Sequence, residues 1–189
     1  MKLPIVAYGD PILKKKAVDI TPDYPELKKL VDDMFETMYA ANGVGLAAPQ
    51  VGLSIRLFVI DITDKEEPGL ENFKKVFMNA QMLEEKGTLW DFNEGCLSIP
   101  DVREDIKRLD TIRISYFDEN WQQHEETYSG LAARVIQHEY DHTEGKLFTD
   151  KLGPLRRAMI KSKLDAISRG AIKVSYKMKF PAGQKNKRR

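Results

Sequence analysis

The sequence predicts one domain that mixes helices with strands and ends in a short basic tail. Apolar residues recur at helical spacing over residues 25–42, whereas residues 111–117 alternate as a strand does. A chain of 189 residues, of which 42% are hydrophobic and 31% charged, can enclose one substantial core. We therefore assign residues 1–183 to a single domain and residues 184–189 to a tail without fixed structure.

Local signals place the individual elements. Strands are expected over residues 55–60, 76–79, 81–90, 111–117 and 121–128, with a hairpin turn at 118–120 and a short strand or extended segment over 172–180. Three helices are expected, each bounded by residues typical of helix ends: Pro25 and Asn42-Gly43, Ser129 and Gly145, and Gly153-Pro154 and Gly170.

Composition excludes several classes of protein. One cysteine cannot form an internal disulfide and fits a reducing compartment, so a cytoplasmic location is expected. The N-terminal residues lack the apolar core of a signal peptide, and no apolar run approaches the length that spans a membrane. We expect neither a membrane nor DNA as a partner.

Charge is distributed unevenly along the chain. From Lys151 onward there are 13 Lys and Arg residues and one acidic residue, a net charge of +12, whereas residues 1–150 carry 17 basic and 28 acidic residues, a net charge of −11. A basic C-terminal arm suggests an anionic partner, and a tail that only keeps the protein soluble explains the pattern equally well.

The segment Gln137-His138-Glu139-Tyr140-Asp141-His142 carries the strongest chemical signal. It holds two of the three histidines, four residues apart, so on a helix both imidazoles face the same way and can bind one ion. Glu139 then lies beside the metal, where it can move a proton. This is the His-Glu-x-x-His pattern of a metal-dependent hydrolase. The alternative, two ordinary histidines on a surface helix, is disfavoured by the scarcity of histidine here.

A catalytic site of this kind needs a third protein ligand. The usual downstream positions fail, because Phe148 stands where a third histidine would be and no glutamate follows Glu144. Upstream, the candidates are His124 and Cys96. We favour Cys96, because it follows Gly95, which permits close approach, and a thiolate binds divalent transition metals strongly. The charged neighbours Glu94 and Asp141 either orient a ligand imidazole or form surface ion pairs.

Three segments together resemble those of a peptide deformylase. They are Gly43-Val44-Gly45-Leu46-Ala47-Ala48-Pro49-Gln50, Glu94-Gly95-Cys96-Leu97-Ser98, and the segment from Gln137 to His142, within a likeness that runs from about Ile5 to Leu152. The resemblance implies an α+β fold with antiparallel sheets packed around the helix that bears the histidines, plus a C-terminal helix. It also implies removal of the formyl group from the N-terminal formyl-methionine of new polypeptides.

The same resemblance implies roles for individual residues. Cys96, His138 and His142 would hold the metal, natively Fe²⁺, with Zn²⁺, Ni²⁺ or Co²⁺ able to replace it. Glu139 would be the general base and acid, and Gln50 and the Leu97 N–H would bind the oxyanion. Residues expected to bind the substrate are Gly45 and Arg103 along the peptide, and Val44, Phe92, Leu131, Arg134, Val135 and His138 around the methionine side chain. Arg134 is unusual at an apolar position, so we expect its stem to line the wall while its charged end reaches outward.

Two other functions compete with this interpretation. One is a metalloprotease or another amidase with the same helix, and the missing downstream ligands disfavour it. The other is a structural zinc module whose basic arm binds nucleic acid, and a structural site would need a fourth ligand and leave Glu139 without a role. For a deformylase, the basic helix from Pro154 and residues 185–189 suggest salt-sensitive contact with the ribosome.

Overall fold

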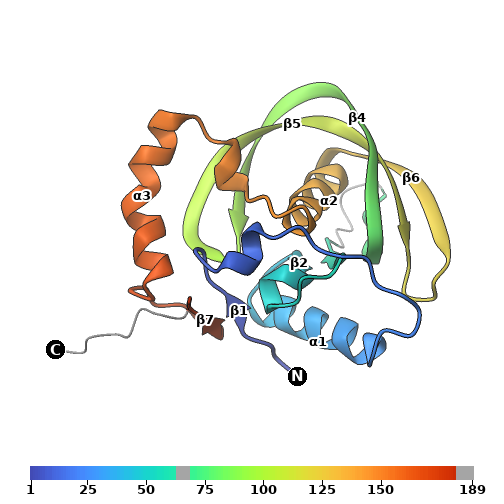
Figure 1. Ribbon diagram of the computed structural model, residues 1–189. Coiled ribbons are helices and arrows are strands. Elements are labelled where there is room, and N and C mark those ends of the chain that lie inside the picture. Colours follow the sequence, from blue (N-terminus) through green and yellow to red (C-terminus); the bar gives the residue numbers. More distant parts are fainter. Residues whose placement is uncertain (63–68, 182–189) are drawn as a thin grey trace.

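The computed structural model describes residues 1–62 and 69–181 and has an α+β fold. A five-stranded antiparallel sheet, in the order β2-β3-β4-β5-β6, curves around the helix α2, and Figure 1 shows α2 beneath the arch of β4 and β5. The strands are β2 (Gly45–Ala47), β3 (Leu57–Asp61), β4 (Lys74–Cys96), β5 (Ile99–Phe117) and β6 (Gln123–Ser129), and α2 spans Gly130–Thr143.

A long hairpin of β4 and β5 replaces the shorter strands that the sequence predicted. Residues 76–79 and 81–90 belong to one strand that continues to Cys96, and residues 111–117 are only the end of β5. The register shifts at four places, between Met78 and Gln81, Met82 and Glu84, Lys86 and Leu89, and Gly95 and Cys96. Such bulges bend a ribbon, which lets the hairpin fold over α2 and return to the site.

The helix α2 buries most of its surface. Ala132, Ala133, Val135 and Ile136 pack into the core formed with the inner face of the sheet. Ser129 occupies the N-cap position as expected, but its side chain makes no capping hydrogen bond there. The chain leaves the helix at Gly145, whose φ is +70° and where a Cβ atom would lie 2.6 Å from the Lys14 carbonyl oxygen. Glycine is therefore required at this turn.

A second helix, α1 (Leu27–Ala40), packs its Val31, Met34 and Met38 against β2 and β3. It begins two residues after Pro25, because Glu26 takes a left-handed conformation with φ of 51° and occupies the N-cap position. Asn42 has φ of 55° just after the helix, which confirms the predicted end.

The two ends of the described chain meet in a small parallel sheet. β1 (Ile5–Val6) pairs with β7 (Met178–Lys179), and α3 (Pro154–Ser168) packs its Ile160, Leu164 and Ile167 into a third apolar cluster with Val6 and Val102. Gly153 and Pro154 start α3 as predicted. In the described part of the chain, 3₁₀ turns also connect the elements: η1 (Pro11–Lys14), η2 (Ala48–Val51) and η3 (Phe148–Lys151).

The predicted basic tail, residues 184–189, lies outside the described residues. None of the helices in the described part of the chain combines the length and apolar character needed to cross a bilayer.

Candidate active site

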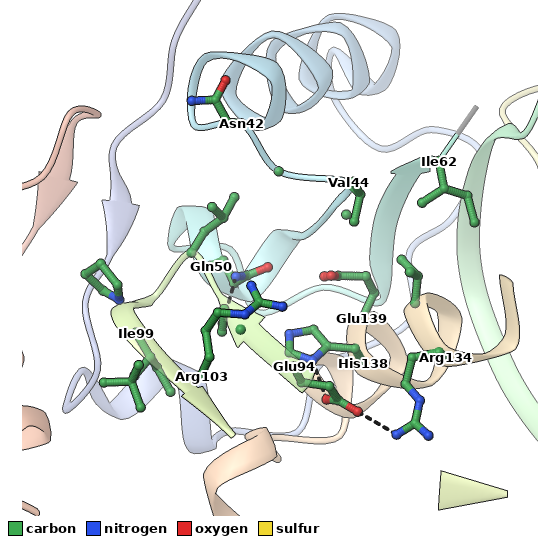
Figure 2. A pocket seen from close by; sticks show the side chains of 18 of the residues that line it. Asn42, Val44, Gln50, Ile62, Glu94, Ile99, Arg103, Arg134, His138 and Glu139 are labelled. Carbon is green, nitrogen blue, oxygen red and sulfur yellow. Dashed lines mark hydrogen bonds and ion pairs between the residues drawn. The ribbon is translucent and has the colours of Figure 1, made fainter. Parts of the chain in front are cut away.

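Three segments that lie far apart in the sequence converge on one cavity of about 870 Å³. One wall comes from β2 and η2, another from the turn between β4 and β5, and the third from α2 (Figure 2). The cavity is lined by every predicted site residue except His142: Val44, Gly45, Gln50, Phe92, Cys96, Leu97, Arg103, Leu131, Arg134, Val135, His138 and Glu139. His142 is buried beside it and contacts Cys96.

Cys96, His138 and His142 form a compact group of potential metal ligands. Their ligand atoms all lie within 4.8 Å of one another, and Cys96 Sγ is 3.3 Å from His142 Nε2. Two ligands bound at 2.3 Å and 2.1 Å with tetrahedral angles would be separated by about 3.6 Å, so the spacing is close to that of a metal site. No other such group of Cys, His and acidic residues occurs in residues 1–62 and 69–181.

The surroundings of the two histidines suit a bound cation. His138 Nδ1 lies 3.0 Å from Glu94 Oε2, which leaves Nε2 free to bind metal. Burial lowers the pKa of His138, but hydrogen bonds to Cys96 and Glu94 raise it well above its usual value, so its environment favours positive charge. Burial and the charge of His138 lower the pKa of His142, which keeps that imidazole in the neutral form that metals bind.

His124 is not part of this group. It is the second residue of β6, where its Nε2 lies 2.8 Å from Asp118 Oδ2 and its ring stacks on Tyr116. The alternative third ligand is therefore wrong, and Cys96 takes that place in the cluster. Phe148, which cannot bind metal, instead stacks on His138 with 6.1 Å between ring centroids.

Glu139 has the features of a proton-transferring group. The residue is 4% exposed, and its Oε2 has no hydrogen-bond partner among the described residues. Burial raises the pKa of Glu139 to about 7, so the carboxyl can accept and release a proton near neutral pH. It projects into the cavity next to Gly45, where a Cβ atom would lie 2.5 Å from Oε1 (Figure 2). Glycine at position 45 thus makes room for the carboxyl group.

Gln50 is held in one orientation by its own turn. Its Oε1 accepts a hydrogen bond from the Ala47 N–H at 2.8 Å, which turns the amide nitrogen toward the cavity. Nε2 then lies 3.4 Å from Cys96 Sγ and 3.5 Å from Ser98 Oγ. Leu97, the other predicted oxyanion residue, lies in the turn between these two positions. The Gln50 amide nitrogen therefore lies beside Cys96, and the Leu97 N–H follows Cys96 directly in the chain.

Glu94 anchors a buried network of charges behind the histidines. Its carboxylate accepts hydrogen bonds from Arg108 Nε at 2.7 Å and from Arg108 Nη2 at 3.0 Å, as well as contacting His138. Burial alone would raise the pKa of Glu94, but hydrogen bonds from His138 and Arg108 hold it well below its usual range. The prediction that Glu94 orients an imidazole is confirmed. Asp141 makes its contact with Arg108 instead: its Oδ2 accepts a hydrogen bond from Arg108 Nη1 at 2.7 Å.

Arg134 differs from its prediction. Its charged end does not reach outward: the residue is 1% exposed, and Nη1 donates to Glu94 Oε1 and the Ile106 carbonyl, both at 2.9 Å. Nη2 donates to the Trp90 carbonyl at 2.8 Å, and the guanidinium stacks over the Trp90 ring at 4.6 Å. A buried carboxylate and two carbonyls thus replace water around this charge.

Arg103 also lines the cavity. Its Nε donates to Asn93 Oδ1 at 2.7 Å, and the guanidinium passes over Gly95, where a Cβ atom would lie 2.7 Å from Nη1. Val44 is half exposed at the rim.

Sequence reasoning missed Arg108 and Tyr176. Arg108 could have been found, because Val102, Glu104, Ile106 and Arg108 alternate along β5 and all point inward. Tyr176 had no such signal, since it reaches the cavity only when the C-terminal segment folds back.

Comparisons with known proteins agree with this geometry. The family model for polypeptide deformylase matches residues 2–158. A peptide deformylase of Christiangramia forsetii is 59% identical over 194 residues, covering 98% of this chain and 99% of the relative. One from Flavobacterium johnsoniae is 53% identical, covering 99% of this chain and all of the relative.

Solved structures extend the likeness to the fold. The crystal structure of a peptide deformylase from Legionella pneumophila is 40% identical with a TM-score of 0.80, over 92% of this chain and 99% of that one. That of Thermotoga maritima is 39% identical with a TM-score of 0.74, over 82% and 99%. The chain therefore belongs to the peptide deformylase family of enzymes.

Proposed function

We propose that this enzyme hydrolyses the formyl group from the N-terminal formyl-methionine of newly made polypeptides and releases formate. The observation that carries the proposal is the buried Glu139 carboxyl, with one oxygen unpartnered, beside a Cys-His-His ligand set in a cavity that also contains an oriented amide at Gln50. Family membership supports the same reaction.

Each residue has a place in the reaction. Cys96, His138 and His142 would hold a divalent ion, which when bound polarises a carbonyl and lowers the pKa of a water toward neutrality. Glu139 takes a proton from the attacking water while the water oxygen bonds to the formyl carbon. Gln50 Nε2 and the Leu97 N–H donate hydrogen bonds to the formyl oxygen as negative charge grows there. Glu139 then returns the proton to the departing amine nitrogen, and the C–N bond breaks.

The rest of the cavity would bind the substrate. The methionine side chain fits the wall formed by the following residues: Val44, Phe92, Leu131, Arg134, Val135 and His138. The Gly45 backbone lies beside Glu139, where it can hydrogen-bond the peptide, and Arg103 can contact the residues that follow.

The proposed native ion is Fe²⁺, with Zn²⁺, Ni²⁺ or Co²⁺ able to substitute. A thiolate and two imidazoles accept all four metals, so the donor set by itself does not choose among them. Anaerobic purification followed by metal analysis and a formate assay on the same sample tests this. Activity lost in air but kept in the nickel or cobalt form supports iron, whereas activity unchanged in air indicates zinc.

Two variants test the reaction. Glu139→Gln should retain a full equivalent of metal and lose nearly all formate release, because the amide cannot carry the proton. Cys96→Ala should lose metal and activity together. Near-normal turnover by Glu139→Gln, or wild-type cleavage of unformylated peptides at internal bonds, would contradict the proposal and favour another amidase.

We also propose that the enzyme works in the cytoplasm and meets its substrate at the ribosome through its basic C-terminal end. On α3, Arg157, Lys161 and Lys163 are exposed, and Arg156 reaches across to Glu104. Ribosome pelleting at increasing salt, with the full chain and a variant truncated before Gln184, tests this. Salt-sensitive binding that the truncation weakens is expected, and equal binding by both chains would show that the tail is not involved.

A further inference from the structure

The C-terminal segment after α3 reaches the active-site cavity, although it lies beyond the residues that the family model matches. That match ends at residue 158. After α3 the chain turns at Gly170 and runs back along the N-terminal segment, where β7 pairs with β1 (Figure 1). Tyr176, just before β7, is one of the residues that line the cavity.

Tyr176 forms a hydrogen bond with the turn between β4 and β5, which follows Cys96. Its hydroxyl donates a hydrogen bond to the Leu97 carbonyl oxygen at 2.7 Å. Burial, together with the nearby Cys96 and Asp101, raises the pKa of Tyr176, so the hydroxyl keeps the proton that it donates. Leu97 follows the ligand Cys96 directly, and its N–H is the proposed donor to the formyl oxygen.

The turn is held from both ends of the chain. The neighbouring carbonyl, that of Ser98, accepts a hydrogen bond from the Tyr8 N–H at 2.8 Å. The strand before Tyr8 is in turn tied to the C-terminal segment, by Ile5 N–H to the Lys177 carbonyl at 2.9 Å and Ala7 N–H to the Lys179 carbonyl at 2.8 Å. Two successive carbonyls of the turn are thus fixed by two segments that also bind each other.

We propose that Tyr176 is a positioning residue, which fixes the Leu97–Ser98 peptide so that the Leu97 N–H stays directed at the formyl oxygen. This inference rests on the proposed deformylase function. Without this hydrogen bond, the backbone could rotate at Leu97, and the Leu97 N–H could then point away from the formyl oxygen. With the carbonyl held, the N–H already has the required direction before charge develops on that oxygen. The hydrogen bond described for the Tyr176 hydroxyl ends on the Leu97 carbonyl and not on a proposed metal ligand, so its influence passes through Leu97.

Tyr176→Phe tests the proposal with the smallest change, because it removes only the hydroxyl. Loss of an oxyanion donor typically lowers kcat about a hundredfold or more, so loosening one should cost less, roughly tenfold. KM and metal content should stay close to the wild-type values, because the change removes only a hydroxyl group that is bound to the Leu97 carbonyl and no metal ligand is altered. Tyr24→Phe, in the loop before α1 and away from the cavity, is the matched control and should retain wild-type kcat.

A spectroscopic measurement separates positioning from general support. In the diamagnetic zinc form, the amide cross-peaks of Leu97 and Ser98 should move in Tyr176→Phe and stay in place in Tyr24→Phe, because the lost hydrogen bond ends on the peptide that joins them. Unchanged kcat or unmoved cross-peaks in Tyr176→Phe would overturn the inference. So would an equal loss of kcat in the control.

The result is distinguishable from failure of the proposed function. If the wild-type enzyme releases formate and Tyr176→Phe does so equally well, only the role of Tyr176 is refuted. If the wild-type enzyme releases no formate from formyl-methionyl peptides, the function itself is refuted.

Discussion

Glu139 depends on its neighbours for both its space and its protonation. Its carboxyl group lies against the Gly45 backbone, and burial raises its pKa to about 7. The Glu94 carboxylate, in contrast, stays ionised, because it contacts Arg108, Arg134 and His138. Two carboxyl groups in one site therefore take different protonation states through different contacts, which suits one for moving a proton and the other for holding a ligand.

Gly45→Ala should disable the enzyme without removing its metal. The added Cβ atom would lie 2.5 Å from Glu139 Oε1 and 2.8 Å from its Cδ, so the carboxyl group must move. A displacement of about 1 Å can lower a rate about a hundredfold, and we expect a loss of kcat of that order. Gly153→Ala is the matched control, because a Cβ there meets nothing within 4 Å. If Gly45→Ala keeps the wild-type kcat, the Glu139 carboxyl does not need its place beside Gly45 for catalysis.

At the level of elements, periodic patterns predicted the helices and the hairpin from 111 to 128 well. They divided β4 because its bulges interrupt the alternation on which strand prediction depends. The Cys96, His138 and His142 cluster was predictable because the two histidines share a helix face and the chain has one cysteine. The burial of Arg134 was not, since it depends on Glu94, a residue of another strand that lies 40 positions away in the sequence.

The sheet also contains a charged cluster that should make stability depend on pH. Burial would raise the pKa of Glu126 on β6, but hydrogen bonds from Tyr116, Tyr128 and Lys75 lower it. A carboxyl whose pKa is depressed by folding stabilises the protein above its unfolded pKa of about 4.3, and this contribution is lost as pH falls through the folded value.

Glu126→Gln should therefore destabilise the protein by about 1 kcal/mol at pH 7, a modest figure because its side chain is 36% exposed. The difference from wild type should shrink as the pH falls below about 4, as measured by urea unfolding at both pH values. Glu125→Gln is the control, since Glu125 is 56% exposed and pairs only with Arg113 among the contacts described for it. A constant difference across this pH range would show that charge on Glu126 is not responsible.

For the whole molecule, the proposed ion would connect parts that the sheet does not join directly. Cys96 ends β4, whereas His138 and His142 belong to α2. An ion bound to all three therefore links the tip of the hairpin to the central helix. Because these ligands come together only in the folded chain, metal affinity adds directly to the free energy of unfolding.

Removing the metal should therefore lower stability reversibly. Protein stripped with a chelator should unfold at a lower urea concentration, and Zn²⁺ or Co²⁺ at 1,000 times its Kd should restore about 4 kcal/mol. Cys96→Ala, which lacks one ligand, should gain much less from the same ion. Lys28 and Asp32 form an exposed ion pair on α1, away from the ligands, so Lys28→Gln should respond to metal as the wild type does. Equal stability with and without metal would mean that the hairpin and α2 are fully held by their packing.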